Sequence, residues 1–229
     1  LEGYGVDCAQ VKRCAGRASS LSAVMVDARG ERMIVNYRDA AMPENAEWIG
    51  DAAGFDAVLA DTRWLAGAAA GFEAARRAGV PAVLDADDPV PDDPAVLARA
   101  THLAFSADGL QGLTGEAEPV RALKSVHDRF GAWVCVTDGA RGVLMCDAAG
   151  VAAIGAFAVD VVDTLGAGDV WHGAFTLRLA EQAGEIEAVR FANAAAAIKV
   201  TRTGGRRGAP LRAEVDAFLS SRQPMEPKF

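Results

Sequence analysis

Short apolar runs that alternate with helical stretches are the feature that most constrains the fold of this 229-residue chain. Strands are predicted at residues 55–60, 83–85, 102–105 and 133–137, and helices at residues 66–78 and 120–130. Gly79 and Pro81 end the first of these helices. Strands that alternate with helices favour a parallel sheet with helices on both faces. The predicted fold class is therefore α/β, in a single domain.

The composition excludes several classes of protein. The net charge of −8 argues against a nucleic-acid partner, because phosphate backbones attract basic surfaces. No apolar run approaches the roughly 20 residues that a membrane-spanning helix needs. The chain has four cysteines, Cys8, Cys14, Cys135 and Cys146. They lack the C-x-x-C spacing that is typical of zinc sites. We therefore expect a cytoplasmic protein with reduced thiols and no membrane partner.

Residues 159–177 carry the strongest chemical signal. An apolar, β-branched run at 159–162 predicts a strand, which is followed by a small-residue turn at 166–168 and then by helical periodicity. The first N–H groups of a helix have no partner within the helix, and the helix dipole favours negative charge there. Gly166 and Gly168 carry no Cβ, so phosphate oxygens can approach the backbone closely. The turn is therefore a candidate anion site.

Asp169 stands at the start of the predicted helix, beside this candidate anion site. A carboxylate there would repel a bound phosphate unless it has a task, such as taking a proton from a hydroxyl that attacks phosphorus. General-base catalysis of this kind contributes about 10²–10⁴-fold in rate. The alternative is that Asp169 only complements the helix dipole, which is worth roughly 0.3–1 kcal/mol.

The wider context of Asp169 decides between these interpretations. The pattern D-T-x-G-A-G-D-x-x-x-G-A is matched at every fixed position, by Asp163, Thr164, Gly166, Ala167, Gly168, Asp169, Gly173 and Ala174. This string resembles the signature of the PfkB (ribokinase-like) carbohydrate kinases. The resemblance implies a ribokinase-like α/β fold with a mostly parallel sheet and a small β lid. It further implies ATP and Mg²⁺ as cofactors and a sugar as substrate. In this family, Asp169 would be the catalytic base and contact the sugar hydroxyl, and residues 166–168 would form an anion hole.

Two strand-like runs at 22–26 and 32–37 flank the turn residues 27–30 and predict a β-hairpin. By resemblance, residues of about 20–40 form the lid over the sugar, and Asn36 hydrogen-bonds a sugar hydroxyl. An exposed Asn at a strand end is the alternative. Family members carry an opening strand and a glycine-rich substrate motif before this point. We therefore expect residues 1–229 to be a kinase domain that lacks its N-terminal portion. By resemblance to the family, we also expect a homodimer.

The resemblance also assigns residues to the nucleotide and to an ion. Thr137, Gly139 and Gly142 match T-x-G-x-x-G and are expected to line the nucleotide phosphates with Thr164, although the same residues also predict a hairpin turn. Asn193, in a helix predicted at 188–200, is expected beside adenine. Asp163, with the loop at 203–208, is expected to bind a monovalent cation such as K⁺. A polar loop without an ion is the alternative.

Ligands of open α/β sheets bind beyond the carboxyl ends of the strands. Polar residues at or just past such ends are Arg63, Asp85, Ser106, Thr137 and Asp163. Arg63 is suited to grip a phosphate, carboxylate or sulfonate, or else it caps a helix or pairs with Asp61. Several short segments resemble the sulfofructose kinases of the family, namely 22–27, 30–32, 34–37, 58–64, 104–106 and 113–115. The predicted reaction is phosphoryl transfer from ATP to a ketose, foremost 6-deoxy-6-sulfofructose at its 1-hydroxyl. The alternatives are a ribokinase- or fructokinase-type kinase for an ordinary sugar and a non-catalytic sugar or nucleotide sensor.

One position departs from the family. Most members carry N-x-x-E before the segment 113–115, a motif that helps to organise magnesium, whereas this chain has Ser106 and Gly109 there. Mg²⁺ often keeps several waters and takes phosphate oxygens directly, so the missing carboxylate leaves open how the ion is held. His172 is three residues beyond Asp169 on the same helix face, and we expect it to pack or to form hydrogen bonds.

Overall fold

The computed structural model describes residues 1–26, 32–227 and 229, which form two compact units, Leu1–Ile49 and Gly50–Phe229. The first unit contains a short 3₁₀-helix, Glu2–Tyr4, and an antiparallel pair of strands, β1 (Leu21–Val26) and β2 (Arg32–Tyr37). The predicted hairpin is thereby confirmed. Its predicted turn at 27–30 lies outside the described residues.

The register of β1 and β2 gathers apolar side chains on one face of this small sheet. Leu21 pairs with Tyr37, and Met25 pairs with Met33, at positions that share a face because side chains alternate along a strand. Val35, between them on β2, belongs to the same face, and all five side chains are more than half exposed.

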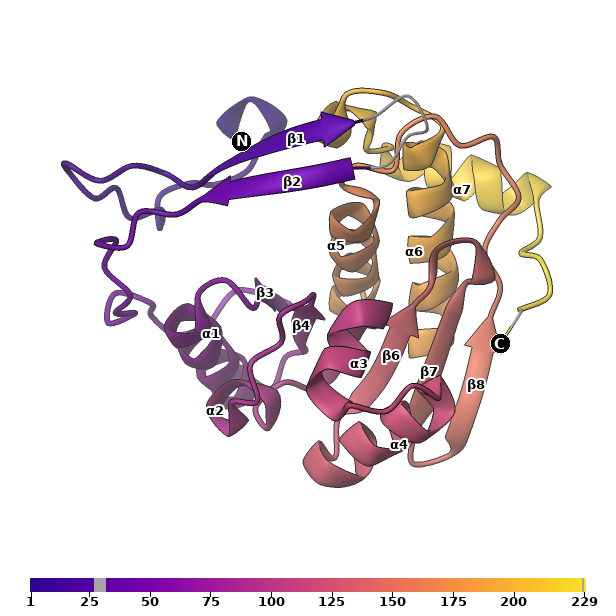
Figure 1. Ribbon diagram of the computed structural model, residues 1–229, viewed down its shortest axis with the longest axis horizontal. Helices are drawn as coiled ribbons and strands as arrows, with labels where there is room; N and C mark the ends of the chain where they lie inside the picture. The colour runs from indigo at the N-terminus through magenta and orange to yellow at the C-terminus, as the bar shows by residue number, and fades with distance from the viewer. Residues whose placement is uncertain (27–31, 228) are drawn as a thin grey trace. The chain divides into compact units, whose positions relative to one another are not determined.

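The second unit is built on a six-stranded sheet with the strand order β3-β4-β5-β6-β7-β8 (Figure 1). Its strands are β3 (Val58–Asp61), β4 (Ala82–Ala86), β5 (His102–Ser106), β6 (Trp133–Thr137), β7 (Val143–Asp147) and β8 (Gly150–Ile154). Strands β3 to β6 are parallel, whereas β7 and β8 are added antiparallel. The helices are α1 (Leu65–Ala78), α2 (Pro94–Leu97), α3 (Ala107–Thr114), α4 (Pro119–Phe130), α5 (Ala167–Ala180), α6 (Glu185–Val200) and α7 (Arg212–Ser221).

Alternate residues of the strands build separate cores on the two faces of the sheet. Leu84 of β4 belongs to a cluster with Phe72 of α1 and Leu123 of α4. Its neighbour Val83 belongs to a second cluster, with Phe175 of α5 and other residues of α5 and α6. Helices therefore cover both faces, and the predicted α/β fold with a mostly parallel sheet is confirmed. No helix in the described part of the chain is long and apolar enough to cross a membrane.

The strand predicted at 159–162 is wrong. This segment pairs with no strand among the described residues, and Val161 and Val162 are 62% and 59% exposed. Instead, the amides of Val162 and Asp163 both donate to the carbonyl oxygen of Val200, at 2.7 and 3.0 Å, at the end of α6. β-branched residues favour extended backbone, but a strand also needs a neighbour with which to pair.

Helix α3 was not predicted from the sequence. Gly109 and Gly112 lower its intrinsic helix propensity by about 1 kcal/mol each. Ser106 compensates at the N-terminus, where its hydroxyl oxygen accepts a hydrogen bond of 3.0 Å from the Gly109 amide. The helix therefore depends on its cap and its packing more than on its composition.

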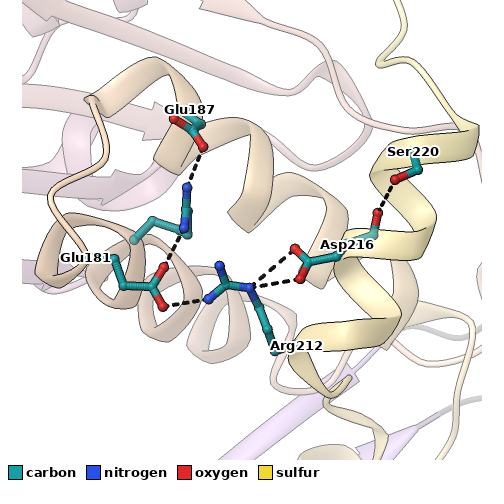
Figure 2. Close-up of polar contacts among 6 residues, drawn as sticks. Glu181, Glu187, Arg212, Asp216 and Ser220 are labelled. Atoms are coloured by element: carbon teal, nitrogen blue, oxygen red, sulfur yellow. Dashed lines mark hydrogen bonds and ion pairs between the residues drawn. The ribbon is translucent and has the colours of Figure 1, made fainter.

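Ion pairs join the C-terminal end of α5 to the start of α6 and to α7 (Figure 2). Arg178 of α5 pairs with Glu181 and with Glu187 of α6. Arg212 of α7 reaches the same Glu181, and its Nε lies 3.1 Å from a carboxylate oxygen of Asp216. The hydrogen bond from Arg212, followed by that from Arg178, lowers the pKa of Glu181. One carboxylate thus holds arginines of two helices.

The cysteines, all in the described part of the chain, are free thiols in two different settings. Cys135 of β6 and Cys146 of β7 are buried in the second unit. Burial raises the pKa of both thiols, well above the ordinary value for Cys135. Cys8 and Cys14 lie in the first unit and are partly exposed.

Candidate active site

The glycine turn that precedes α5 is open to a ligand. Gly166 is the N-cap of α5 with a φ of 78°, a left-handed conformation that favours glycine, and no side chain caps the helix there. The amide of Ala167 donates to the Thr164 carbonyl oxygen at 3.1 Å. At Gly168 no described atom lies within 4 Å of the position that a Cβ would take. The first-turn amides can therefore receive an anion without obstruction by a side chain.

Asp169 lies directly beside this turn. It is an exposed residue in the first turn of α5, and its Oδ2 lies 3.6 Å from the position that a Cβ on Gly166 would take. A carboxylate here can accept a proton from a hydroxyl that approaches the same turn. The geometry thus brings the predicted base and the predicted anion hole together.

Contacts of His172 connect the turn to strands β4 and β5. It is buried, with 4% exposure, and its Nδ1 lies 2.8 Å from the Gly168 carbonyl oxygen and 3.3 Å from Oδ2 of Asp85 on β4. Its Nε2 lies 3.3 Å from the carbonyl oxygen of Ala104 on β5. The carbonyl oxygens of Gly168 and Ala104 can only accept, so a ring nitrogen that bonds to either of them is the donor. The predicted hydrogen-bonding role of His172 is confirmed.

Asp85 places a second carboxyl group below the turn. Burial raises its pKa, the carboxylates of Asp169, Asp87 and Asp61 raise it further, and His172 opposes the shift. Asp61 ends β3, so acidic groups collect at the carboxyl edge of the sheet. Carboxyl groups at this edge can accept hydrogen bonds from the hydroxyl groups of a ligand.

Asp163 is held by its own loop and by a residue that sequence reasoning missed. Its Oδ1 accepts from the Leu165 amide at 2.8 Å, its Oδ2 accepts from the Gly205 amide at 3.5 Å, and the Leu165 contact is the main cause of its lowered pKa. Lys199 donates to the Asp163 carbonyl oxygen at 2.8 Å. The available signal for Lys199 was a charged residue within the apolar helical run 188–200.

The residues predicted to contact the nucleotide converge on one segment. Gly142 has a φ of 103°, and a Cβ there would lie 2.2 Å from the Ile154 carbonyl oxygen. Asn193 donates to the adjacent Gly155 carbonyl oxygen at 3.1 Å and accepts from Trp171 Nε1 of α5 at 2.7 Å. The Asn193 amide is buried and engaged with protein groups, so its predicted contact with adenine stays a prediction.

Thr137 and Gly139 frame the same hairpin turn. Thr137 ends β6, and its hydroxyl donates to the Phe105 carbonyl oxygen at 3.3 Å, while Gly139 begins a 3₁₀ turn with a φ of 47°. Thr164 is exposed just before the glycine turn. The predicted roles of all these residues at phosphate groups remain predictions.

The sequence pattern described as pfkB family carbohydrate kinase matches residues 1–212. The chain is a member of the pfkB family. Over 104 residues it is 38% identical to a ribokinase of Haemophilus influenzae, an alignment that covers 45% of this chain and 34% of that protein. The chain thus spans about a third of the length of this curated relative.

Solved structures place the pfkB-family chain among ribokinase-like folds. A ribokinase of Thermotoga maritima is 29% identical with a TM-score of 0.76, covering 88% of this chain and 70% of that one. A ribokinase of Arabidopsis thaliana, solved with ribose and ATP, is 26% identical with a TM-score of 0.74, covering 86% and 68% respectively. The predicted ribokinase-like fold is confirmed, whereas the closer resemblance to sulfofructose kinases stays a prediction.

The departure of this chain from the family motif N-x-x-E has a structural reason. A Cβ on Gly109 would lie 2.4 Å from the carbonyl oxygen of Ala86, so this backbone leaves no room for a glutamate at that position. Ser106, at the first motif position, caps α3. Among the described residues, no group of three or more His, Cys, Asp or Glu side chains could hold a metal ion.

Besides Asp169, the residues predicted to contact the substrate are Arg63, in the second unit, and Asn36, in the first. Arg63 follows β3, where its guanidinium lies 3.3 Å from the Asp88 carbonyl oxygen and 3.6 Å from the Asp87 carboxylate. Its side chain is about half exposed at 51%. Asn36 lies on β2 of the first unit, and its side-chain oxygen accepts a hydrogen bond of 2.7 Å from Ser22. Sugar contacts of both residues remain predictions.

Proposed function

We propose that this pfkB-family chain transfers the γ-phosphate of ATP to a hydroxyl group of a sugar. The observation that supports the proposal best is the exposed carboxylate of Asp169 beside a glycine turn that no side chain caps. An acidic residue in this turn could also serve the helix dipole alone, but a proton-accepting role also accounts for the exposure of its carboxylate beside the anion site.

In this proposal each part of the turn has one task. Asp169 takes the proton of the attacking hydroxyl, and the amides of Gly166 and Gly168 donate to the oxygens on which negative charge develops. The Ala167 amide, which donates to the Thr164 carbonyl oxygen, would have to share or exchange that hydrogen bond to take part. His172 keeps Gly168 in position through its hydrogen bond to the carbonyl oxygen. ATP would lie along Thr137, Gly139, Gly142 and Thr164, near Asn193. Mg²⁺ bound to its phosphates would neutralise charge.

For the substrate we propose a neutral, ribose-type sugar. Ribokinases are among the relatives, and one of them was solved with ribose and ATP. The carboxylates of Asp61, Asp85 and Asp87 give the sheet edge a negative charge, which suits sugar hydroxyl groups and repels anions.

6-Deoxy-6-sulfofructose is the second candidate substrate. Its sulfonate needs a cationic partner, and the half-exposed guanidinium of Arg63 at the ligand edge of β3 is suited to that role. Against this candidate, the guanidinium already lies 3.6 Å from the carboxylate of Asp87. A sulfonate would have to compete with that pair.

Turnover of ATP with ribose, fructose and sulfofructose tests these proposals. We expect the highest kcat/KM for ribose. If sulfofructose is preferred instead, Arg63→Ala should lower its kcat/KM by about 10- to 150-fold, the equivalent of one charge-assisted hydrogen bond of about 1.5–3 kcal/mol. Arg121→Ala, which removes an exposed arginine of α4, is the matched control. ATP binding without turnover of any sugar would favour a non-catalytic sensor.

We also propose that the β1–β2 sheet forms the sugar lid and contributes to a homodimer. Its face of exposed apolar side chains supports the proposal, because covering such a face removes apolar surface from water and lowers the free energy. Val35→Lys should convert a dimer to a monomer in light scattering coupled to size exclusion. An unchanged mass would exclude this face from the dimer contact.

A further inference from the structure

A lysine ammonium is buried at the place where the sequence predicts a monovalent cation. Lys199 lies in the last turn of α6, and its side chain has 0% exposure. A lysine is almost never fully buried unless an anion or several acceptors compensate its charge. The partners of this ammonium must therefore be groups of the protein.

Asp163 supplies these partners. The Nζ atom donates to the main-chain carbonyl oxygen of Asp163 at 2.8 Å and lies 3.5 Å from Oδ2 of its carboxylate. The carboxylate also accepts from the amides of Leu165 and Gly205. The ammonium therefore lies where the end of α6, the loop around Gly205 and the segment before the glycine turn meet.

A bound K⁺ does not fit this arrangement. An ion held by Asp163 would use the carboxylate and carbonyl oxygens, and the Lys199 ammonium already contacts both. Two positive charges on the same oxygens repel strongly where little water screens them. A charge of the chain itself therefore satisfies the oxygens that were expected to hold the ion.

We propose that the Lys199 ammonium is the resident monovalent cation of this chain, and that it holds the segment 163–168 in place without K⁺. A tethered charge cannot dissociate, so the backbone that leads into the glycine turn is organised at any K⁺ concentration. The structural part of this proposal is independent of the proposed kinase activity. Its meaning for catalysis rests on that activity.

Thermal unfolding of the full chain in KCl and in choline chloride of equal ionic strength tests the structural part. The wild-type Tm should be the same in both salts. Lys199→Met removes the charge and keeps a long, flexible side chain, so its Tm should fall in choline chloride and rise again with K⁺ until the effect saturates. Lys124→Met, at an exposed lysine of α4, is the matched control and should show no cation dependence.

Several outcomes would overturn the proposal. Saturable stabilisation of the wild type by K⁺ would show that an ion site is still functional. This result would overturn the proposal even if Lys199→Met failed to fold. A folded Lys199→Met that ignores K⁺ would show that no cation is needed at Asp163.

Activity provides the second readout. Wild-type turnover should be equal in the two salts, whereas Lys199→Met should lose about tenfold or more in choline chloride, about 1.4 kcal/mol, and regain it with K⁺. If no sugar is phosphorylated at all, the proposed function fails. The unfolding series would still decide the cation proposal.

Discussion

The two ends of α5 are built in opposite ways. At the N-terminal end, Gly166 caps the helix without a side chain and Asp169 faces solvent. At the C-terminal end, Arg178 pairs with Glu181 and with Glu187 of α6, and Arg212 of α7 pairs with the same Glu181, so ion pairs join α5 to both helices (Figure 2). Polar groups that the protein itself satisfies contribute to stability, whereas those it leaves open are available for a ligand. Substitutions at the first end should therefore change activity, and those at the second should change stability.

The largest effect is expected for Asp169→Asn. Loss of the proposed base should lower kcat by about 10²-fold or more, while ATP affinity and Tm change little, because the role proposed for this carboxylate is at the sugar hydroxyl. Steady-state kinetics and calorimetric ATP titration measure both. Asp216→Asn, in the ion-pair network, is the control that should retain kcat. Near-normal turnover of Asp169→Asn would remove this residue as the base.

Gly168→Val should also impair activity in a folded protein. Space around Gly168 is open, so a branched side chain fits the structure but stands where a phosphate would approach. We expect kcat/KM for ATP to fall about tenfold or more, equivalent to about 1.4 kcal/mol. Gly142→Ala is the contrasting variant, because its Cβ would clash with Ile154, and it should lose about 1–3 kcal/mol of stability. Unchanged kinetics of Gly168→Val would mean that the turn is not the anion site.

A smaller effect is expected at the other end of the helix. Glu181→Gln removes the shared partner of Arg178 and Arg212 and should lower the free energy of unfolding by about 0.5–1 kcal/mol, since Glu181 and Arg212 are 35% and 43% exposed and solvent screens their charges. Urea unfolding at low and high salt measures the loss, which salt should reduce. A tenfold fall in kcat would contradict the separation of the two ends.

The smallest effect concerns pH. Because its pKa is lowered in the fold, chiefly by Arg212, ionised Glu181 contributes stability above its ordinary pKa. That contribution is lost as the pH falls through the lowered pKa. The difference in stability between wild type and Glu181→Gln should therefore vanish in acid. A difference that persists there would assign the stabilisation to packing instead of charge.

The sequence was sufficient to predict the layers of the second unit and the residues of its turn. Apolar runs such as 83–85 and 133–137 are buried strands because both faces of the sheet are covered by helices. The run 159–162 is also rich in β-branched residues, yet it forms no strand and its Val161 and Val162 are exposed, because strand pairing depends on neighbours that local sequence does not specify. Lys199 could not be paired with Asp163 in advance, since 36 positions separate them along the chain.

The placement of the cysteines has a practical consequence. Cys8 and Cys14 are partly exposed in the unit that carries the hairpin, while the thiols of Cys135 and Cys146 are buried and have a raised pKa. Since the thiolate is the reactive form, maleimide dyes at neutral pH should attach to the first unit alone. The wild-type chain thus has its own labelling sites in the hairpin unit. The fluorescence of a dye attached there should report on this unit when a sugar is added, without engineered cysteines.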